Sequence, residues 1–278
     1  MPEMHPRTGE AAGIQNRPQS RTVLSWQGNV PGEPCEIRIT CATCNLRETC
    51  LSGGVPAEDL ERVENIVYAH RQIRRGERLF SAGDEFKCLF AIRSGFFKTS
   101  LIDSDAREQI TGFFMGGELL GMDGLGSGRH QSYAIALEDS LVCVMPYLLI
   151  EQVALDVPPL QRRLHSVLAR EIARNHGIML LLGSMSAEER LAAFLLNLSR
   201  RYLHRGYSGT SFLLRMTREE LGSYLGLKLE TVSRLFSTFH RRGLIEVAQR
   251  QISIVDIKGL ENLLALGGLI TSVDTART

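Results

Sequence analysis

The sequence predicts an α+β protein with three parts in chain order: a β-rich domain, one long helix and a C-terminal winged helix-turn-helix. Three observations predict this fold. Residues 70–147 contain short apolar runs separated by glycines, which is typical of an antiparallel roll or barrel. Residues 158–182 change to the three- and four-residue spacing of a helix. Residues 217–254 carry two short helical segments followed by two short strand-like segments.

The composition is that of an ordinary globular protein, with 278 residues of which 44% are hydrophobic and 23% are charged. No stretch approaches the roughly 18 consecutive apolar residues of a membrane helix. Residues 1–20 are polar and are interrupted by three prolines, so they lack the layout of a secretory signal. We therefore expect a cytoplasmic protein without membrane contact. In that compartment the six cysteines indicate metal or redox chemistry rather than disulfides.

Changes in composition divide the chain into five segments. Residues 1–34 are rich in Pro, Gly, Gln and Arg and predict a disordered tail. Residues 35–55 predict a cysteine-rich loop, residues 56–157 the β-rich domain, residues 158–184 the long helix, and residues 185–278 the winged helix-turn-helix domain.

Three cysteines of the loop have a spacing that suits a metal centre. Cys41, Cys44 and Cys50 form a C-x2-C-x5-C run, in which the two-residue gap lets two thiolates converge on one centre. An iron–sulfur cluster of the cubane type takes four thiolates, so the spacing favours such a cluster with a fourth ligand from elsewhere. A structural zinc site is the main alternative, although the usual second C-x2-C pair is missing. The spacing leaves the fourth ligand open among Cys35, Cys88 and Cys143.

The long helix predicted over residues 158–184 has a narrow apolar seam. A helix that packs against the chain's own core is the alternative, but a narrow seam favours packing against a second copy of the chain. A polar residue on the seam weakens the packing and can fix its register. The residues expected at this dimer contact are Leu164, Leu168, Ile172, Asn175, Ile178 and Met179.

The C-terminal region carries the pattern of a DNA-reading helix-turn-helix. Thr217 and Glu220 have the spacing of a capping box, and Gly226 permits the turn between the two helices. The second helix lacks a good N-cap because Lys228 stands there, a side chain that could instead reach a phosphate. A two-stranded wing is expected at residues 244–254. The residues that face outward near the start of the second helix, and that can contact bases, are Glu230, Ser233 and Arg234.

The charge distribution agrees with a nucleic-acid partner. The whole chain has a net charge of only +1. Residues 190–250 contain eleven Lys and Arg against four Glu and no Asp, a local balance of +7. A basic segment inside a nearly neutral protein is the electrostatic footprint expected for binding to double-stranded DNA.

Four stretches of the chain resemble a known family. Residues 90–95, 108–113, 187–194 and 230–234 are similar to the fumarate and nitrate reduction (FNR) regulators, the oxygen-sensing branch of the CRP/FNR superfamily. The resemblance runs from about residue 35 to residue 258. It implies a transcription regulator, not an enzyme, whose β-rich domain is a jelly roll of the cyclic-nucleotide-binding type. It also implies a homodimer that binds a palindrome of the TTGAT-N4-ATCAA type through Glu230, Ser233 and Arg234.

The resemblance further implies a 4Fe-4S cluster held by Cys41, Cys44, Cys50 and Cys143, and contacts with RNA polymerase through residues 103–107 and the region of Arg205. An intact cluster is expected to favour the DNA-binding dimer, and oxygen is expected to destroy the cluster and inactivate the protein. Thr49, beside Cys50, is polar where at least one well-known relative has leucine, so we expect solvent to reach the cluster site more easily than in that relative.

Two other regulators are alternatives to this reading. A cyclic-nucleotide-responsive regulator would use the same roll, and Glu118 and Ser132 match pocket residues of such proteins. However, Gln131 stands where an arginine would hold the cyclic phosphate, which argues against nucleotide binding. A regulator that is stabilised by zinc and binds DNA constitutively is the second alternative.

Overall fold

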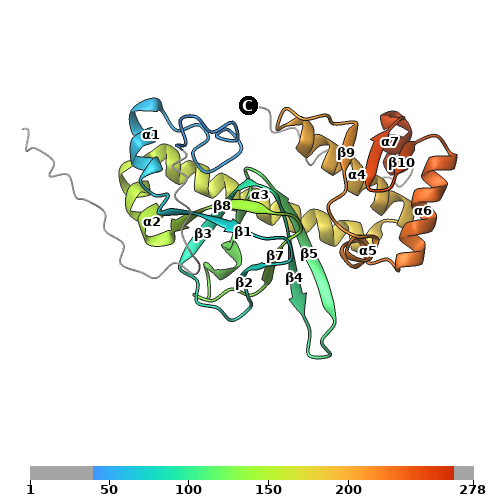
Figure 1. Ribbon diagram of the computed structural model, residues 1–278, viewed down its shortest axis with the longest axis horizontal. Helices are drawn as coiled ribbons and strands as arrows, with labels where there is room; N and C mark the ends of the chain where they lie inside the picture. The colour runs from blue at the N-terminus through green and yellow to red at the C-terminus, as the bar shows by residue number, and fades with distance from the viewer. Residues whose placement is uncertain (1–39, 266–278) are drawn as a thin grey trace, which may run out of the picture.

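The computed structural model describes residues 40–265 (Figure 1). The predicted disordered tail and Cys35 lie outside the described residues. The β-rich domain consists of two four-stranded antiparallel sheets, with strand orders β1-β8-β3-β6 and β2-β7-β4-β5. Their strands are β1 (Ala69–Ile73), β2 (Arg78–Phe80), β3 (Cys88–Ser94), β4 (Phe96–Ile102), β5 (Glu108–Met115), β6 (Leu119–Leu120), β7 (Tyr133–Ala136) and β8 (Ser140–Pro146).

The two sheets enclose an apolar core in which side chains alternate along each strand. Val142 and Val144 of β8 are completely buried in this core, together with Phe97 of β4. Cys143 lies between the two valines and therefore points to the opposite face of the sheet. There it packs with a second apolar cluster, to which the cysteine loop contributes Leu51. Strand alternation thus directs Cys143 toward the other cysteines.

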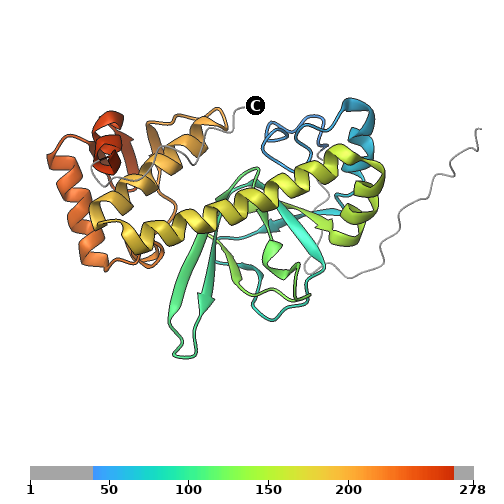
Figure 2. The ribbon, with the colours of Figure 1, turned by 180° about the vertical axis from the view of Figure 1, so that it is seen from behind.

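Helices close the outer face of this sheet. They are α1 (Ala57–Glu64), α2 (Tyr147–Asp156) and α3 (Pro158–Ser184). The helix predicted from residue 158 is confirmed as α3, which begins with proline in its first turn. Figure 2 shows α3 running the length of the molecule, from the side of α1 and α2 to the C-terminal domain. Leu160 and Leu164 anchor its first turns in the second apolar cluster.

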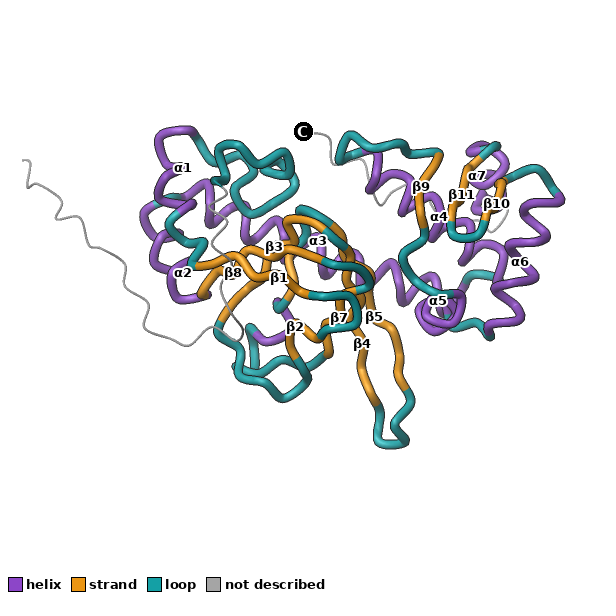
Figure 3. The backbone as a smooth tube through the Cα atoms, in the orientation of Figure 1, coloured by secondary structure: helices purple, strands orange, loops and turns teal. Residues whose placement is uncertain are grey.

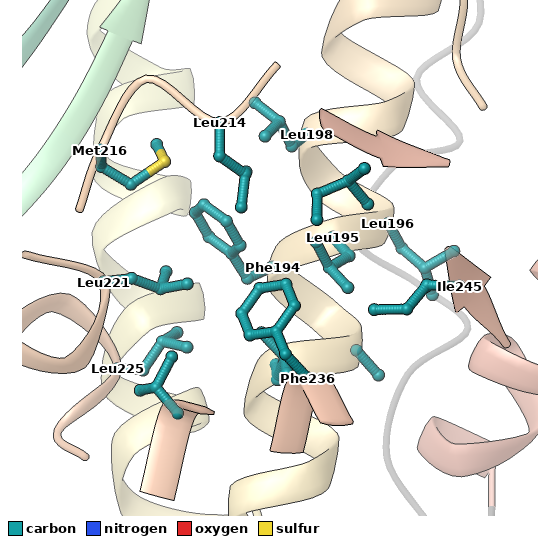
Figure 4. Packing of buried hydrophobic residues seen from close by; sticks show 14 of the residues in the cluster. Phe194, Leu195, Leu196, Leu198, Leu214, Met216, Leu221, Leu225, Phe236 and Ile245 are labelled. Atoms are coloured by element: carbon teal, nitrogen blue, oxygen red, sulfur yellow. The ribbon is translucent and has the colours of Figure 1, made fainter. Parts of the chain in front are cut away.

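The C-terminal domain is a winged helix-turn-helix, as predicted. It comprises α4 (Ala187–Leu203), β9 (Ser211–Leu213), α5 (Arg218–Leu225), α6 (Leu229–Arg241), β10 (Ile245–Ala248), β11 (Gln251–Ile254) and α7 (Ile257–Ala265). Thr217 and Glu220 form the expected capping box at α5, and Ser186 and Glu189 form another at α4. Figure 4 shows the core that these helices share, which includes Phe194, Leu221 and Phe236.

The C-terminal domain packs directly on the β-rich domain. The ring of Phe113 on β5 contacts the rings of Phe194 and Tyr224. Lys98 on β4 forms an ion pair with Glu220 at 3.0 Å, and the backbone N–H of Ile110 donates to Ser223 Oγ at 2.9 Å. The two domains therefore share one continuous core. Within residues 40–265, no helix has the length and apolarity required to cross a bilayer.

Candidate functional site

The cysteine loop, residues 40–55, contains turns but no helix or strand (Figure 3). Local hydrogen bonds shape it, such as those from Cys44 N to Cys41 O at 3.2 Å and from Cys50 N to Leu46 O at 3.0 Å. Longer contacts fix its position: Arg163 of α3 donates to the carbonyl of Cys50 at 2.9 Å and to the carbonyl of Glu48 at 2.5 Å. The loop is thereby fastened to the long helix.

The four predicted ligand residues line one cavity. Cys41, Cys44 and Cys50 come from the loop, and Cys143 comes from β8. His70 and Arg93 also line the cavity, and the Arg93 guanidinium contacts the sulfur of Cys44. The fifth described cysteine, Cys88, is buried in the core between the two sheets and does not line the cavity. The described cysteines are all free thiols.

Four thiols at one cavity are a set of side chains that a metal centre could use. A tetrahedral zinc site with Zn–S bonds of 2.3 Å brings its thiolates to about 3.8 Å from one another. In residues 40–265, no three His, Cys, Asp or Glu side chains converge to hold a single ion. A cubane iron–sulfur cluster would also take four thiolates, and Cys41, Cys44, Cys50 and Cys143 would be the residues to hold it. Burial raises the pKa of Cys50 to about 11 and that of Cys143 to about 12, so metal binding must release protons.

Thr49 lies away from this cavity. Its hydroxyl donates to the carbonyl of Leu46 at 2.9 Å, and its side chain lies against Gly117. Thr49 does not line the space between the cysteines. The expectation that its polarity exposes the cluster site to solvent is therefore wrong, because the side chain faces the turn before β6.

The hydrogen-bond donors just before β7 are occupied by a side chain of the protein itself. Asp123, in the short 3-10 helix η1 (Met122–Gly124), accepts hydrogen bonds from the backbone N–H groups of Gln131 and Ser132, each at 2.9 Å. It also accepts from the Ser132 hydroxyl at 2.8 Å. Burial opposes ionisation of this carboxyl, but hydrogen bonds from His130 and Ser132 outweigh it and lower the pKa of Asp123. An internal carboxylate thus engages the donors of Gln131 and Ser132, two positions that the sequence analysis compared with a nucleotide pocket.

The recognition helix α6 presents its predicted base-reading residues to solvent. Glu230, Ser233 and Arg234 are exposed, whereas Val232 and Phe236 are buried against the rest of the domain. Lys228 makes no side-chain cap at the start of α6, as predicted. The wing formed by β10 and β11 follows in the expected place.

Comparisons with known proteins agree with both halves of the chain. The Crp-like helix-turn-helix domain family matches residues 189–263, and the cyclic nucleotide-binding domain family matches residues 70–155. The transcriptional regulatory protein btr of Bordetella pertussis is 46% identical over 224 residues, which cover 81% of this chain and 93% of that protein. The fumarate and nitrate reduction regulatory protein of Escherichia coli is 41% identical over 225 residues, 81% of this chain and 90% of that protein.

The chain belongs to the CRP/FNR family of transcription regulators. Among solved structures, FixK2 from Bradyrhizobium japonicum is similar with a TM-score of 0.64 and 31% sequence identity, over 70% of this chain and 96% of that chain. The α+β fold with a roll and a C-terminal helix-turn-helix is therefore confirmed. These relatives are transcription regulators rather than enzymes.

The predicted dimer residues of this CRP/FNR chain divide into two groups along α3. Leu164 is buried in the chain's own core, and Leu168 packs partly against it. Further along the helix, Ile172 is 57% exposed, Met179 is 70% exposed, and Asn175 is also exposed. The remaining residue, Ile178, is half-buried. The second half of α3 is thus the part that can meet another molecule.

The two surfaces expected to contact RNA polymerase differ in their exposure to solvent. Residues 103–107 form the exposed tip of the β4–β5 hairpin, where Asp103 accepts from Arg107 Nε at 2.8 Å. Arg205, in contrast, has only 5% of its side chain exposed and is ion-paired with Glu118. Arg205 itself therefore serves the contact between the two domains.

Sequence reasoning gave no role to Arg93, Arg163 or Asp123. Arg93 contacts Cys44, Arg163 contacts Cys50, and Asp123 contacts Ser132. Residue spacing in the sequence does not indicate any of these three contacts. The family resemblance supplied Cys143 as the fourth ligand, and strand alternation in β8 would have indicated the same face of the sheet.

Proposed function

We propose that this CRP/FNR regulator senses oxygen through a 4Fe-4S cluster held by Cys41, Cys44, Cys50 and Cys143. The observation that carries this proposal is that these four thiols, from segments about ninety residues apart, line one cavity. When bound, the cluster supplies an oxygen-labile group that holds the loop and the roll together. The high similarity to a fumarate and nitrate reduction regulatory protein supports this assignment.

The protein's own residues then carry the signal to DNA. Arg163 joins the cysteine loop to α3, so a fixed loop holds the first turns of the helix in place. The exposed part of α3, with Ile172, Asn175 and Met179, is the surface that we assign to the homodimer. Asn175 lacks the charge that would repel its copy across a two-fold axis. Loss of the cluster frees the loop and weakens the dimer.

The dimer is needed because two recognition helices, about 34 Å apart, read two half-sites of a palindrome. We assign the base contacts of a TTGAT-N4-ATCAA-type site to Glu230, Ser233 and Arg234, since all three are exposed at the start of α6. Arg234 suits a bidentate contact to guanine, and Glu230 suits the amino group of cytosine. We assign the contact with RNA polymerase to the exposed tip at residues 103–107. We expect the protein to act in the cytoplasm.

The test is anaerobic purification of the full chain, with iron, sulfide and zinc analysis, followed by DNA binding before and after exposure to air. About four iron and four sulfide per chain are expected. Air is expected to remove both the iron and the tight binding to the palindrome. Cys88→Ala is the matched control, because Cys88 lies outside the cavity and should leave the iron content unchanged. One zinc per chain with air-insensitive DNA binding would instead establish the constitutive zinc-stabilised regulator.

A further inference from the structure

The turn between β5 and β6 lies between the cysteine loop and the DNA-binding domain. Its residues are 116–118. On one side the turn contacts Leu46 and Thr49 of the loop. On the other side it accepts hydrogen bonds from Arg201 of α4 and from Arg205, which follows α4. It is a second connection from the cysteines to the DNA-binding domain, separate from the one through Arg163 and α3.

The contact with the DNA-binding domain is built around Glu118. Its carboxylate accepts from Arg201 Nη2 at 2.7 Å and from Arg205 Nη2 at 2.6 Å. Arg205 Nε also donates to the carbonyl of Gly116 at 2.6 Å, and Arg201 Nη2 donates to the carbonyl of Phe113 at 2.8 Å. Arg201 Nε donates to Glu118 as well, at 3.1 Å. Four charge-assisted hydrogen bonds therefore join the two arginines to the turn, and a fifth joins Arg201 to β5.

The contact with the cysteine loop is close-fitting. Gly117 has a φ of +85°, and any side chain there would overlap the side chain of Thr49. A Cβ added at Gly116 would lie 2.8 Å from Leu46 Cδ1. Thr49 and Leu46 are in turn tied to Cys50, whose N–H donates to the carbonyl of Leu46 at 3.0 Å. A movement of the loop therefore removes a support of the turn.

We propose that Glu118 is a positioning residue through which the cysteine loop holds the DNA-binding domain against the roll. This inference rests on the proposed cluster on the four cysteines. With the loop in place, Leu46 and Thr49 support the turn, and Glu118 and the Gly116 carbonyl hold Arg201 and Arg205. When the loop is released, the turn loses that support and α4 is held less firmly. The acidic side chain that would face a nucleotide in a related roll serves here to join two domains.

The experiment is hydrogen–deuterium exchange of the full-length protein, with and without its cluster, for the native chain, Glu118→Gln and Glu138→Gln. Glu138 is the matched control, because it also pairs across the two domains, with Arg215 at 3.0 Å. It lies outside the turn at residues 116–118, which is the segment that meets Leu46 and Thr49. All samples are compared at concentrations where sedimentation shows the same oligomeric state. Iron and sulfide are measured on each sample.

In the native chain, loss of the cluster should speed exchange in α4 by about fivefold or more, the lower end of typical coupling between sites. In Glu118→Gln, α4 should exchange fast in both states while the iron content stays native. Glu138→Gln should keep the dependence on the cluster. If Glu118→Gln does not fold, Arg201→Lys tests the same contact, since lysine keeps the charge but loses the paired hydrogen bonds.

Two results would overturn the proposal without affecting the cluster. One is native exchange in α4 that does not change when iron is lost, and the other is a Glu118→Gln chain that responds like the native one. A native chain that binds no iron under anaerobic conditions would instead overturn the proposed function, and the coupling with it. The metal analysis therefore distinguishes the two failures.

Discussion

The helix-turn-helix takes its local shape from residues close together in the chain, whereas the position of the cysteine loop depends on residues from distant parts of the chain. Thr217 and Glu220 cap α5, and the inward faces of α5 and α6 fill the domain core. The loop depends instead on Arg163 from α3, on Glu64 from α1 and on the turn at Gly117. A region built from local contacts keeps its shape under many conditions, whereas a region fastened from outside can be released as a unit.

The largest expected effect tests the loop's dependence on the cluster. Cys143→Ser replaces the one proposed ligand outside the loop, so iron content should fall from about four per chain to near zero. Anaerobic DNA binding should fall with it, because the loop is no longer joined to β8. Iron analysis of anaerobic samples checks this, with Cys88→Ala as the variant that should keep its iron. Full iron in Cys143→Ser would show that another residue supplies the fourth bond.

The next effect tests the helix-turn-helix without touching the loop. Arg234→Ala removes an exposed side chain from α6 and should weaken binding to the palindrome by about 1–3 kcal/mol, roughly 5- to 150-fold. The iron content and the thermal stability should stay native. Fluorescence anisotropy with labelled DNA measures the affinity. Arg200→Ala, which removes an exposed arginine of α4, should change affinity far less, and an equal loss in both variants would contradict base reading by Arg234.

These two regions also show how far the sequence could predict the structure. The capping box, the Gly226 turn and the exposed positions of α6 follow from residues within four places of one another, so pattern alone located them. The position of the cysteine loop depends on contacts with residues such as Arg163 and Gly117, more than sixty places away. The spacing of Cys41, Cys44 and Cys50 predicted three ligands and left the fourth open. The residues around these cysteines do not indicate which strand of the roll packs against the loop.

A pH series tests the contact between the domains. Burial opposes ionisation of Glu118, but Arg201, Arg205 and Arg174 outweigh it and hold the pKa of this carboxyl below its ordinary value of 4.5. Because the folded pKa is lowered, the contact stabilises the protein above pH 4.5 and is lost as the pH falls through the folded pKa. The native chain should therefore lose its stability advantage over Glu118→Gln as the pH falls below 4.5 and through the lowered pKa of Glu118. Urea unfolding of both chains measures this, and a constant difference across the series would contradict it.

The smallest effect concerns the caps of the two helices. Thr217→Ala removes the capping box of α5 and should cost about 1 kcal/mol, a fall in melting temperature of about 2–4 °C. Lys228→Ser supplies the missing cap of α6 and should raise stability by a similar amount. Calorimetry measures both changes in stability.

The same Lys228→Ser change also tests DNA binding. If Lys228 contacts a phosphate, the change should weaken binding and lower the dependence of binding on salt. Salt titrations measure this, and unchanged salt dependence would exclude the phosphate contact.

Asp123 gives the roll an unusual property. The carboxylate that bonds to Gln131 and Ser132 is part of the chain, so it can neither arrive nor leave. A receptor of this shape that waits for a diffusible messenger has a vacant form and a filled form, and it switches between them as the messenger's concentration changes. In this roll the same donors are already engaged by Asp123. The proposed switch therefore acts at another place, at the cavity that the four cysteines line.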